Sequence, residues 1–208
     1  MNASLENMMT ERLHAQQTFE GAVATLLHDV VALHGAEFGD VQLPIGSDLV
    51  IVAQLGLGAA FLQAFKQVRA DDGSACARAL RERKTVVIAD VECDEDFAVF
   101  RGDARAAGYR SVQSSPLFAG NGKFIGMVST MFAHVHEPTA IEMDTLRKYS
   151  GPAADHLQKL LHGGSIAAKA AEMHLRLCTE LGLDGFAGVG KISARKAASP
   201  YDDPHSDL

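Results

Sequence analysis

The sequence predicts an α+β fold built on an antiparallel β-sheet, with helices from both ends of the chain able to cover one face of that sheet. Three observations predict it. Two pairs of strand-like segments are each joined by a turn sequence, at 38–55 and at 109–132. Segments with a helical apolar stripe lie at 10–34 and at 139–161. The alternation of strand and helix typical of a parallel, doubly wound sheet is absent from this order.

The first element is predicted to be one long helix over 10–34. Its apolar residues recur at steps of three and four, and they are Phe19, Val23, Leu26, Val30 and Leu33. Gly35 follows the last of them and is expected to end the helix.

A β-hairpin is predicted next, with strands at 38–43 and 49–55 around a turn at 44–48. The turn has the sequence Pro-Ile-Gly-Ser-Asp, and the second strand contains adjacent β-branched residues. Such an uninterrupted apolar run is typical of a strand that is covered on both faces.

The middle of the chain carries weaker patterns. We expect a short helix within 56–68, a second helix at 75–82 opened by Gly73 and Ser74, and a strand at 85–89. The segment 90–108 is predicted to be a loop with a short helix around its two phenylalanines.

The second hairpin is the clearest local signal. Strands at 109–118 and 123–132 flank the turn Ala-Gly-Asn-Gly at 119–122. Thr139 and Glu142 then match a capping box that starts the last long helix, for which Gly151-Pro152 predicts a kink or a short break.

We divide the chain into a domain at 1–162 and a C-terminal extension at 163–208. The extension is expected to be helical at 165–181, and the Gly-, Ala- and Ser-rich stretch 188–208 is expected to be mostly disordered.

Composition narrows the class of protein. The formal net charge of −7 disfavours a general affinity for nucleic acid or for anionic membranes. No apolar run approaches the ~20 residues of a membrane-spanning helix. The three cysteines form no Cys-x-x-Cys pair, which argues against zinc-ribbon and iron–sulfur sites and suits a reducing compartment. We therefore predict a cytoplasmic protein.

Several segments, in their order and spacing, resemble the GAF family over about 20–161. They are HGAEFGDVQL, LVIVAQLGL followed by FLQAF, GSACARAL, VVIADV, AAGYRSVQSSPL, GKFIGMVST and HVHEPTAIEMDTLR. The resemblance implies a sheet with the terminal helices on one face and a pocket on the other, roofed by the segments between the strands. It also implies dimerisation through the terminal helices.

The pocket that this resemblance implies would be lined by roof segments and by one face of the sheet. Its candidate ligand-binding residues are Phe61, Phe65, Cys76, Phe97, Phe100, Gln113, Ser115, Met127 and Ser129. Apolar walls with a few placed polar groups are typical of ligand sites, although phenylalanine, methionine and cysteine also fill ordinary cores.

Cys76 is a candidate nucleophile, alone or together with Cys93, but the preferred interpretation of Cys76 is a buried or half-buried structural cysteine. A helix N-terminus there would lower the pKa of the thiol, and the free methionine sulfoxide reductases within the GAF family have a cysteine near this motif. Cys93 comes too early to be their resolving cysteine, and their typical tryptophan is missing. No Cys-His dipeptide for bilin attachment and no cyclic-nucleotide signature of the phosphodiesterase GAF domains is present.

Two polar clusters are interpreted as ordinary surface. His134 and His136 have no third ligand at a motif spacing, so we predict no metal site. The acidic run at 90–96 departs from the calcium-loop pattern and is expected to be a solvated loop.

Taken together, these features predict a small-molecule-binding, signal-sensing protein without a catalytic site. It would be a homodimer and would act on a downstream signalling partner. Its ligand and any cofactor are not identified by the sequence. The alternatives are a thiol-dependent reductase that uses Cys76 and an interaction scaffold without a ligand.

Overall fold

The structure is a computed structural model, and it describes residues 4–65, 68–69 and 72–183. Its described strands form one six-stranded sheet in the order β3-β2-β1-β6-β5-β4. The strand bounds are β1 Phe38–Ile45, β2 Asp48–Leu55, β3 Val68–Arg69, β4 Val86–Ile88, β5 Ser111–Phe118 and β6 Phe124–Phe132. Every pair of neighbours is antiparallel, which confirms the predicted sheet.

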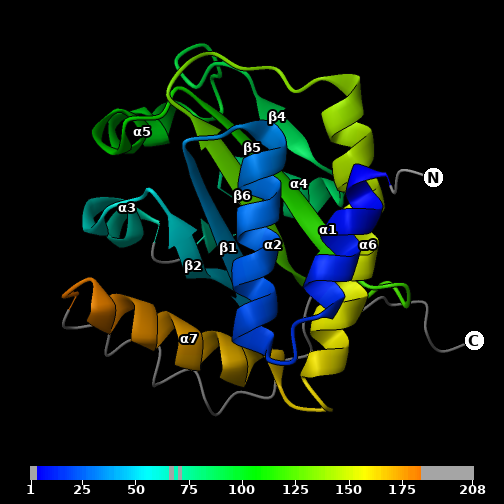
Figure 1. Cartoon of the computed structure of the whole chain (residues 1–208). Helices are drawn as coiled ribbons and strands as arrows, with labels where there is room; N and C mark the ends of the chain where they lie inside the picture. Colours follow the sequence, from blue (N-terminus) through cyan, green and yellow to red (C-terminus); the bar gives the residue numbers. More distant parts are fainter. Residues whose placement is uncertain (1–3, 66–67, 70–71, 184–208) are drawn as a thin grey trace, which may run out of the picture.

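Helices cover both faces of this sheet (Figure 1). Their bounds are α1 Leu5–His14, α2 Phe19–His34, α3 Ala59–Ala64, α4 Ala75–Glu82, the 3₁₀ turn η1 Ala98–Phe100, α5 Arg101–Ala107, α6 Ala140–Leu160 and α7 Ile166–Glu180. One apolar core joins α1, α2 and α6 to the sheet. A second core lies on the opposite face, beneath α3, α4 and α5. The α+β architecture expected from the sequence is therefore confirmed.

The predicted first helix is wrong in one respect, because it is two helices. α1 ends at His14, and α2 begins after Thr18, whose hydroxyl accepts a hydrogen bond of 3.2 Å from the Gly21 amide. That N-cap satisfies an amide that would otherwise lack a partner in the first turn of α2. Gly35 ends α2 with a φ of 59°, as expected.

On the face of the sheet that α1, α2 and α6 cover, α2 packs closely against β1. A Cβ added to Gly39 would lie 2.6 Å from Cγ2 of Val31. Only glycine leaves the space for α2 to approach the strand at this point.

α6 corrects a second expectation. Its capping box is present, with Thr139 accepting from the Glu142 amide and the Glu142 carboxylate accepting from the Thr139 amide. Pro152 was expected to kink or break the helix, but α6 runs continuously from Ala140 to Leu160. The buried residues on both sides of the proline, among them Tyr149 and Leu157, pack into one core and hold the helix together.

α7 covers the edge of β2 that the two-residue β3 leaves open. Nδ1 of His174 lies 2.7 Å from the Ile51 carbonyl oxygen, so α7 supplies a partner where the sheet does not. Met173 packs into the core beneath α2, whereas Leu177 contacts the opposite core. The helix predicted at 165–181 is confirmed, and the stretch 188–208 lies outside the described residues.

Among the described residues, no helix combines the length and the apolar character needed to cross a membrane.

Candidate functional site

The face opposite α1, α2 and α6 is covered by the short elements α3, α4, η1 and α5, which we call the roof. Aromatic rings dominate the core beneath it. Phe61 stacks on Phe65 with ring centroids 4.6 Å apart, and Phe65 contacts Phe100 at 5.4 Å. Phe61 also meets Tyr109 edge to face at 6.0 Å. These rings join α3 to η1 and to the start of β5.

A cavity of about 270 Å³, partly open to solvent, lies between the roof and the sheet. It is lined by Asp40, Gln42, Phe61, Phe65, Ser74, Ala75, Cys76, Phe97, Tyr109, Val112, Ser114, Ser129 and Met131. Little of that volume is wide enough to hold an atom: the free space takes about one water molecule, far less than a drug-sized ligand site. Because the walls lie close together, the centre of the cavity accepts only a group of about the size of a water molecule.

Asp40 and Gln42 give the cavity its polarity. They lie two residues apart on β1, so their side chains project from the same face of the sheet. Asp40 is completely buried, and neither of its carboxylate oxygens has a hydrogen-bond partner in the described structure. The same holds for Oε1 of Gln42. Burial raises the pKa of Asp40 to about 7, against a smaller opposing effect of the Gln42 amide.

The serine hydroxyls of the cavity already have partners. The hydroxyls of Ser114 and Ser129 share a hydrogen bond of 2.9 Å across β5 and β6. Ser74 caps α4 by accepting from the Ala77 amide at 3.3 Å. It also lies 3.3 Å from the sulfur of Cys76. Asp40 and Gln42 are therefore unusual, since buried polar atoms normally have a partner. Outside the cavity, Oε1 of Gln113 and Nε2 of His136 also lack one within the described structure.

Cys76 does begin a helix, as the sequence predicts, but the expected lowering of its pKa is wrong. Burial raises the pKa of the Cys76 thiol to about 12, and this effect outweighs the Ser74 hydrogen bond that opposes it. The thiol is therefore protonated at neutral pH and is a poor nucleophile. Cys93 is exposed, and its pKa is also raised, because its thiol donates to Asp90.

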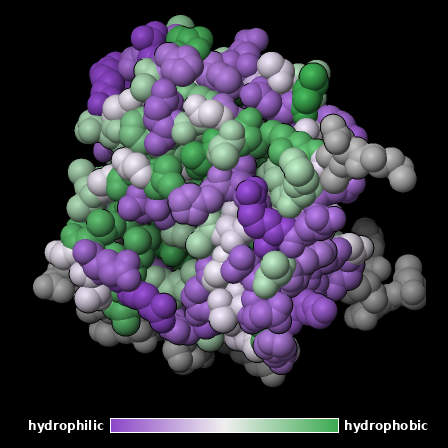
Figure 2. Space-filling view, viewed as in Figure 1, coloured by the Kyte–Doolittle hydropathy of each residue, from purple (hydrophilic) through white to green (hydrophobic). Residues whose placement is uncertain are grey.

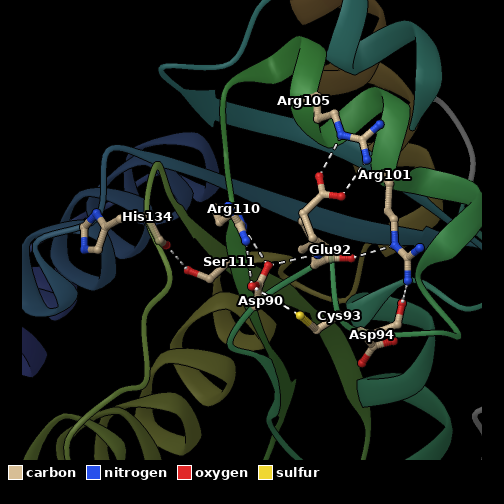
Figure 3. A network of polar contacts seen from close by, with 10 residues as sticks. Asp90, Glu92, Cys93, Asp94, Arg101, Arg105, Arg110, Ser111 and His134 are labelled. Atoms are coloured by element: carbon tan, nitrogen blue, oxygen red, sulfur yellow. Dashed lines mark hydrogen bonds and ion pairs between the residues drawn. The ribbon is translucent and has the colours of Figure 1, made fainter.

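Ion pairs fix the roof segment that follows β4 (Figure 3). Both carboxylate oxygens of Asp90 accept from Arg110, at 2.7 and 2.8 Å. Glu92 pairs in the same bidentate way with Arg105 of α5. The acidic run predicted to be a solvated loop is therefore ordered by arginines, whose positions in space the local sequence does not reveal.

Arg101 ties the same segment down through its main chain. Its guanidinium donates to the carbonyl oxygens of Val91 and Asp94, at 3.0 and 2.8 Å. Nearby, a Cβ on Gly73 would lie 1.9 Å from the carbonyl oxygen of Asp96. Glycine at position 73 thus lets the start of α4 pass directly beside this segment.

Five of the nine predicted pocket residues line the cavity: Phe61, Phe65, Cys76, Phe97 and Ser129. Met127 and Phe100 pack in the same core without lining the cavity. Gln113 and Ser115 lie on the opposite face of β5, since Ser114 between them lines the cavity. Nε2 of Gln113 lies 3.5 Å from Nε2 of His34, and Ser115 shares a hydrogen bond of 2.9 Å with Thr85. Ligand binding by the predicted residues stays a prediction.

Sequence reasoning missed eight lining residues: Asp40, Gln42, Ser74, Ala75, Tyr109, Val112, Ser114 and Met131. For the first two a signal was present, because polar residues alternate with the apolar Val41 and Leu43 along β1. Period-two alternation in a strand predicts that the polar residues share one face. The others depend on how the roof folds over the sheet.

The two rings of the His-x-His pair lie edge to face with centroids 6.0 Å apart, and each has a different further neighbour. His136 stacks on Phe132 with centroids 3.8 Å apart, whereas Nδ1 of His134 lies 3.6 Å from a Glu37 oxygen. Within the described ranges, no group of three or more histidine, cysteine, aspartate or glutamate side chains is arranged to hold a metal ion.

A second hollow lies on the outer surface between α2, β2 and α7. Its volume is about 760 Å³, and apolar residues such as Val23 and Met173 form its floor beside the charged Glu20, Arg176 and Glu180. On the face of the molecule seen in Figure 2, hydrophobic and hydrophilic residues are interspersed. No buried polar atom in this hollow lacks a partner within the described chain.

The family model described as "GAF domain" matches residues 16–158. The chain is similar to the GAF domain of a phosphoenolpyruvate-protein phosphotransferase from Acinetobacter, with a TM-score of 0.61, 10% identity and coverage of 76% of this chain and 92% of that one. A putative GAF sensor protein from Burkholderia vietnamiensis gives a TM-score of 0.59 at 16% identity, over 75% and 93% of the two chains.

The free methionine-R-sulfoxide reductase from Neisseria meningitidis, solved with its substrate, gives a TM-score of 0.56 at 18% identity, over 82% and 96%. A search of curated protein sequences found no match. At such identities the solved structures establish the fold alone.

Proposed function

This chain belongs to the GAF domain family, and we propose that it is a signal-sensing domain that binds a small molecule in the cavity between the roof and the sheet. The carrying observation is the pair Asp40 and Gln42, whose buried side-chain oxygens face the cavity without partners. A buried acceptor without a partner costs about 1–3 kcal/mol. A ligand that donates to these oxygens removes that cost.

The arrangement of the roof supports a route from ligand to signal. The cavity is lined by Phe61 of α3, by Phe65 directly after that helix, by the start of α4 and by Phe97 beside η1. Filling it stabilises the arrangement of roof segments that contacts the ligand. The sheet joins this site to α1, α2 and α6, through which we propose that the chain forms a homodimer and passes the signal to a downstream protein.

Thiol chemistry at Cys76 is the alternative that the reductase-like fold raises. The raised pKa of the buried thiol argues against it, because the nucleophile in such chemistry is the thiolate. An interaction scaffold without a ligand is the other alternative, and it leaves the partnerless oxygens of Asp40 and Gln42 without a role.

A thermal-shift screen with a matched pair of variants tests the proposal. The full chain is screened against small cations, anions and neutral metabolites, alongside Ser129→Leu, which fills the cavity, and Ser129→Ala, which leaves it open. Circular dichroism verifies that both variants fold. We expect at least one compound to raise the melting temperature of wild type and Ser129→Ala but not of Ser129→Leu. No such compound in a broad screen, or equal shifts in all three proteins, contradicts the proposed function.

A further inference from the structure

The buried side-chain atoms of the cavity that lack hydrogen-bond partners are all acceptors. Within the described structure they are the two carboxylate oxygens of Asp40 and Oε1 of Gln42. A protonated Asp40 can donate one hydrogen bond. Its oxygens and the amide oxygen of Gln42 can still accept more hydrogen bonds than the surrounding protein donates to them. The complementary ligand is a donor of several hydrogen bonds.

The charge of the lining points the same way. Among the described residues that line the cavity, Asp40 is the one with an ionisable carboxyl group, and none is a lysine, arginine or histidine. Arginines near the cavity already bond to the segment after β4, and they are Arg78, Arg101, Arg105 and Arg110. An ionised Asp40 therefore has no counter-ion among the described lining residues, and a buried carboxylate without a counter-ion is costly.

The apolar part of the lining suits a cation as well. The rings of Phe61, Phe65, Phe97 and Tyr109 line the same cavity as Asp40. An aromatic face attracts a cation through its quadrupole, most strongly where water is excluded. The same rings offer nothing to a hard metal ion, which requires oxygen ligands on several sides.

Size limits the group that meets Asp40. The centre of the cavity accepts groups of about the size of a water molecule, which matches an ammonium headgroup. A quaternary ammonium is larger and has no N–H to donate, and a guanidinium is a wide planar fork. Three N–H donors on one nitrogen match three partnerless acceptors.

We propose that the cavity binds the primary ammonium group of a small organic amine, which donates to the Asp40 carboxylate and to Oε1 of Gln42. This inference rests on the proposed function and names the chemical class of its ligand. The interaction is non-covalent: Asp40 releases its proton to solvent as the ammonium group enters. The remainder of the amine extends toward the side of the cavity that is open to solvent.

The test is a titration of the isotopically labelled full chain at pH 8, followed by nuclear magnetic resonance. The probe is ethylammonium chloride, with propanol, propionate, tetramethylammonium and sodium chloride as controls at matched ionic strength. A ligand of so few atoms makes few contacts, so its dissociation constant is roughly millimolar or weaker. The titration therefore extends to tens of millimolar.

We expect saturable shifts centred on β1 and α4 with ethylammonium, and none with the four controls. Asp40→Asn preserves the shape and removes the charge, so it should weaken binding about 10- to 100-fold. Gln42→Met should weaken it several-fold and serves as the second variant if Asp40→Asn is poorly folded. Asp144→Asn removes a carboxylate from the surface of α6 and should leave binding unchanged.

Two contrary outcomes are distinguishable. If the screen finds a neutral or anionic compound that binds in the cavity, or if Asp40→Asn binds ethylammonium as well as wild type does, the amine inference is wrong and the ligand-binding function stands. If neither ethylammonium nor any compound of the screen distinguishes Ser129→Ala from Ser129→Leu, the ligand-binding function and the amine inference are both wrong.

Discussion

The hydroxyl of Tyr149 on α6 donates a hydrogen bond of 2.8 Å to the buried carboxylate of Asp29 on α2. Arg12 of α1 pairs with the other oxygen of the same carboxylate. A single buried side chain thus links the three helices that cover one face of the sheet. Both carboxylate oxygens have partners, in contrast to those of Asp40 on the other face.

Tyr149→Phe tests this link. The variant keeps the ring and removes the donor, so the buried Asp29 loses one partner. We expect a loss of about 1–3 kcal/mol in the free energy of unfolding, measured by urea denaturation at pH 7. Asp29→Asn combined with Tyr149→Phe completes a double-mutant cycle. A coupling energy near zero contradicts the role assigned to this hydrogen bond.

The raised pKa of Asp40 is expected to make the stability of the fold depend on pH. Its pKa is about 7 in the folded chain and near 3.9 in an unfolded one. The folded state therefore holds a proton that the unfolded state has lost, and stability falls as the pH rises between these two values. Asp40→Asn removes the effect.

We expect Asp40→Asn to gain stability over wild type from pH 4 to pH 7, with the difference reaching a few kcal/mol and then levelling off. The groups facing Asp40, Cys76 of α4 and Tyr109 before β5, have raised pKa values and stay neutral throughout this range. Urea denaturation of both proteins in steps of pH measures the difference. A difference that is constant across the range contradicts the burial of an unpaired carboxyl.

The proposed homodimer predicts an effect of exposed apolar side chains on the terminal helices. Met8 of α1 and Ile141 of α6 are 50% and 79% exposed, and α1 packs beside α6 (Figure 1). We expect Met8→Lys combined with Ile141→Lys to shift a dimer to monomer, measured by light scattering after size exclusion. Leu175→Lys, a matched change on α7, should leave the dimer intact. A wild-type chain that is monomeric at every concentration contradicts the prediction.

The hydrogen bonds of Arg101 are expected to hold the segment after β4 in place. Its guanidinium bonds to two main-chain carbonyls of the segment after β4, whereas Arg105 is 65% exposed and contacts one side chain. We expect Arg101→Ala to speed amide hydrogen exchange over residues 91–97 by about tenfold, and Arg105→Ala to change it little, because exposed ion pairs contribute less. Equal effects of the two changes contradict this assignment.

The elements with short-range causes were predictable from the sequence. The turn at 119–122, the capping box at Thr139 and Glu142 and the helix at Ala75–Glu82 each follow from residues within a few positions of one another. The break before Thr18 was not predicted, because the apolar stripe that predicts the helix begins only at Phe19 and carries no information on the residues before it.

The candidate site was predictable only in part, for a related reason. Phe61, Cys76 and Phe97 were found because aromatic and sulfur-containing residues in roof segments are natural lining. Gln113 and Ser115 were placed on the wrong face, since the face of β5 depends on a register that its neighbouring strands set. Asp40 could have been found from the alternation of polar and apolar residues along β1. It was missed because the segment was interpreted only as a strand of the first hairpin.

A high-resolution crystal structure of the full chain, purified without added ligand and then soaked in ethylammonium, tests the central claim most directly. The account predicts electron density for a bound molecule in the cavity, with a nitrogen at hydrogen-bond distance from Asp40 and from Oε1 of Gln42. A cavity filled by the side chains of Phe61, Phe65 and Met131, with Asp40 bonded to groups of the protein itself, would contradict it.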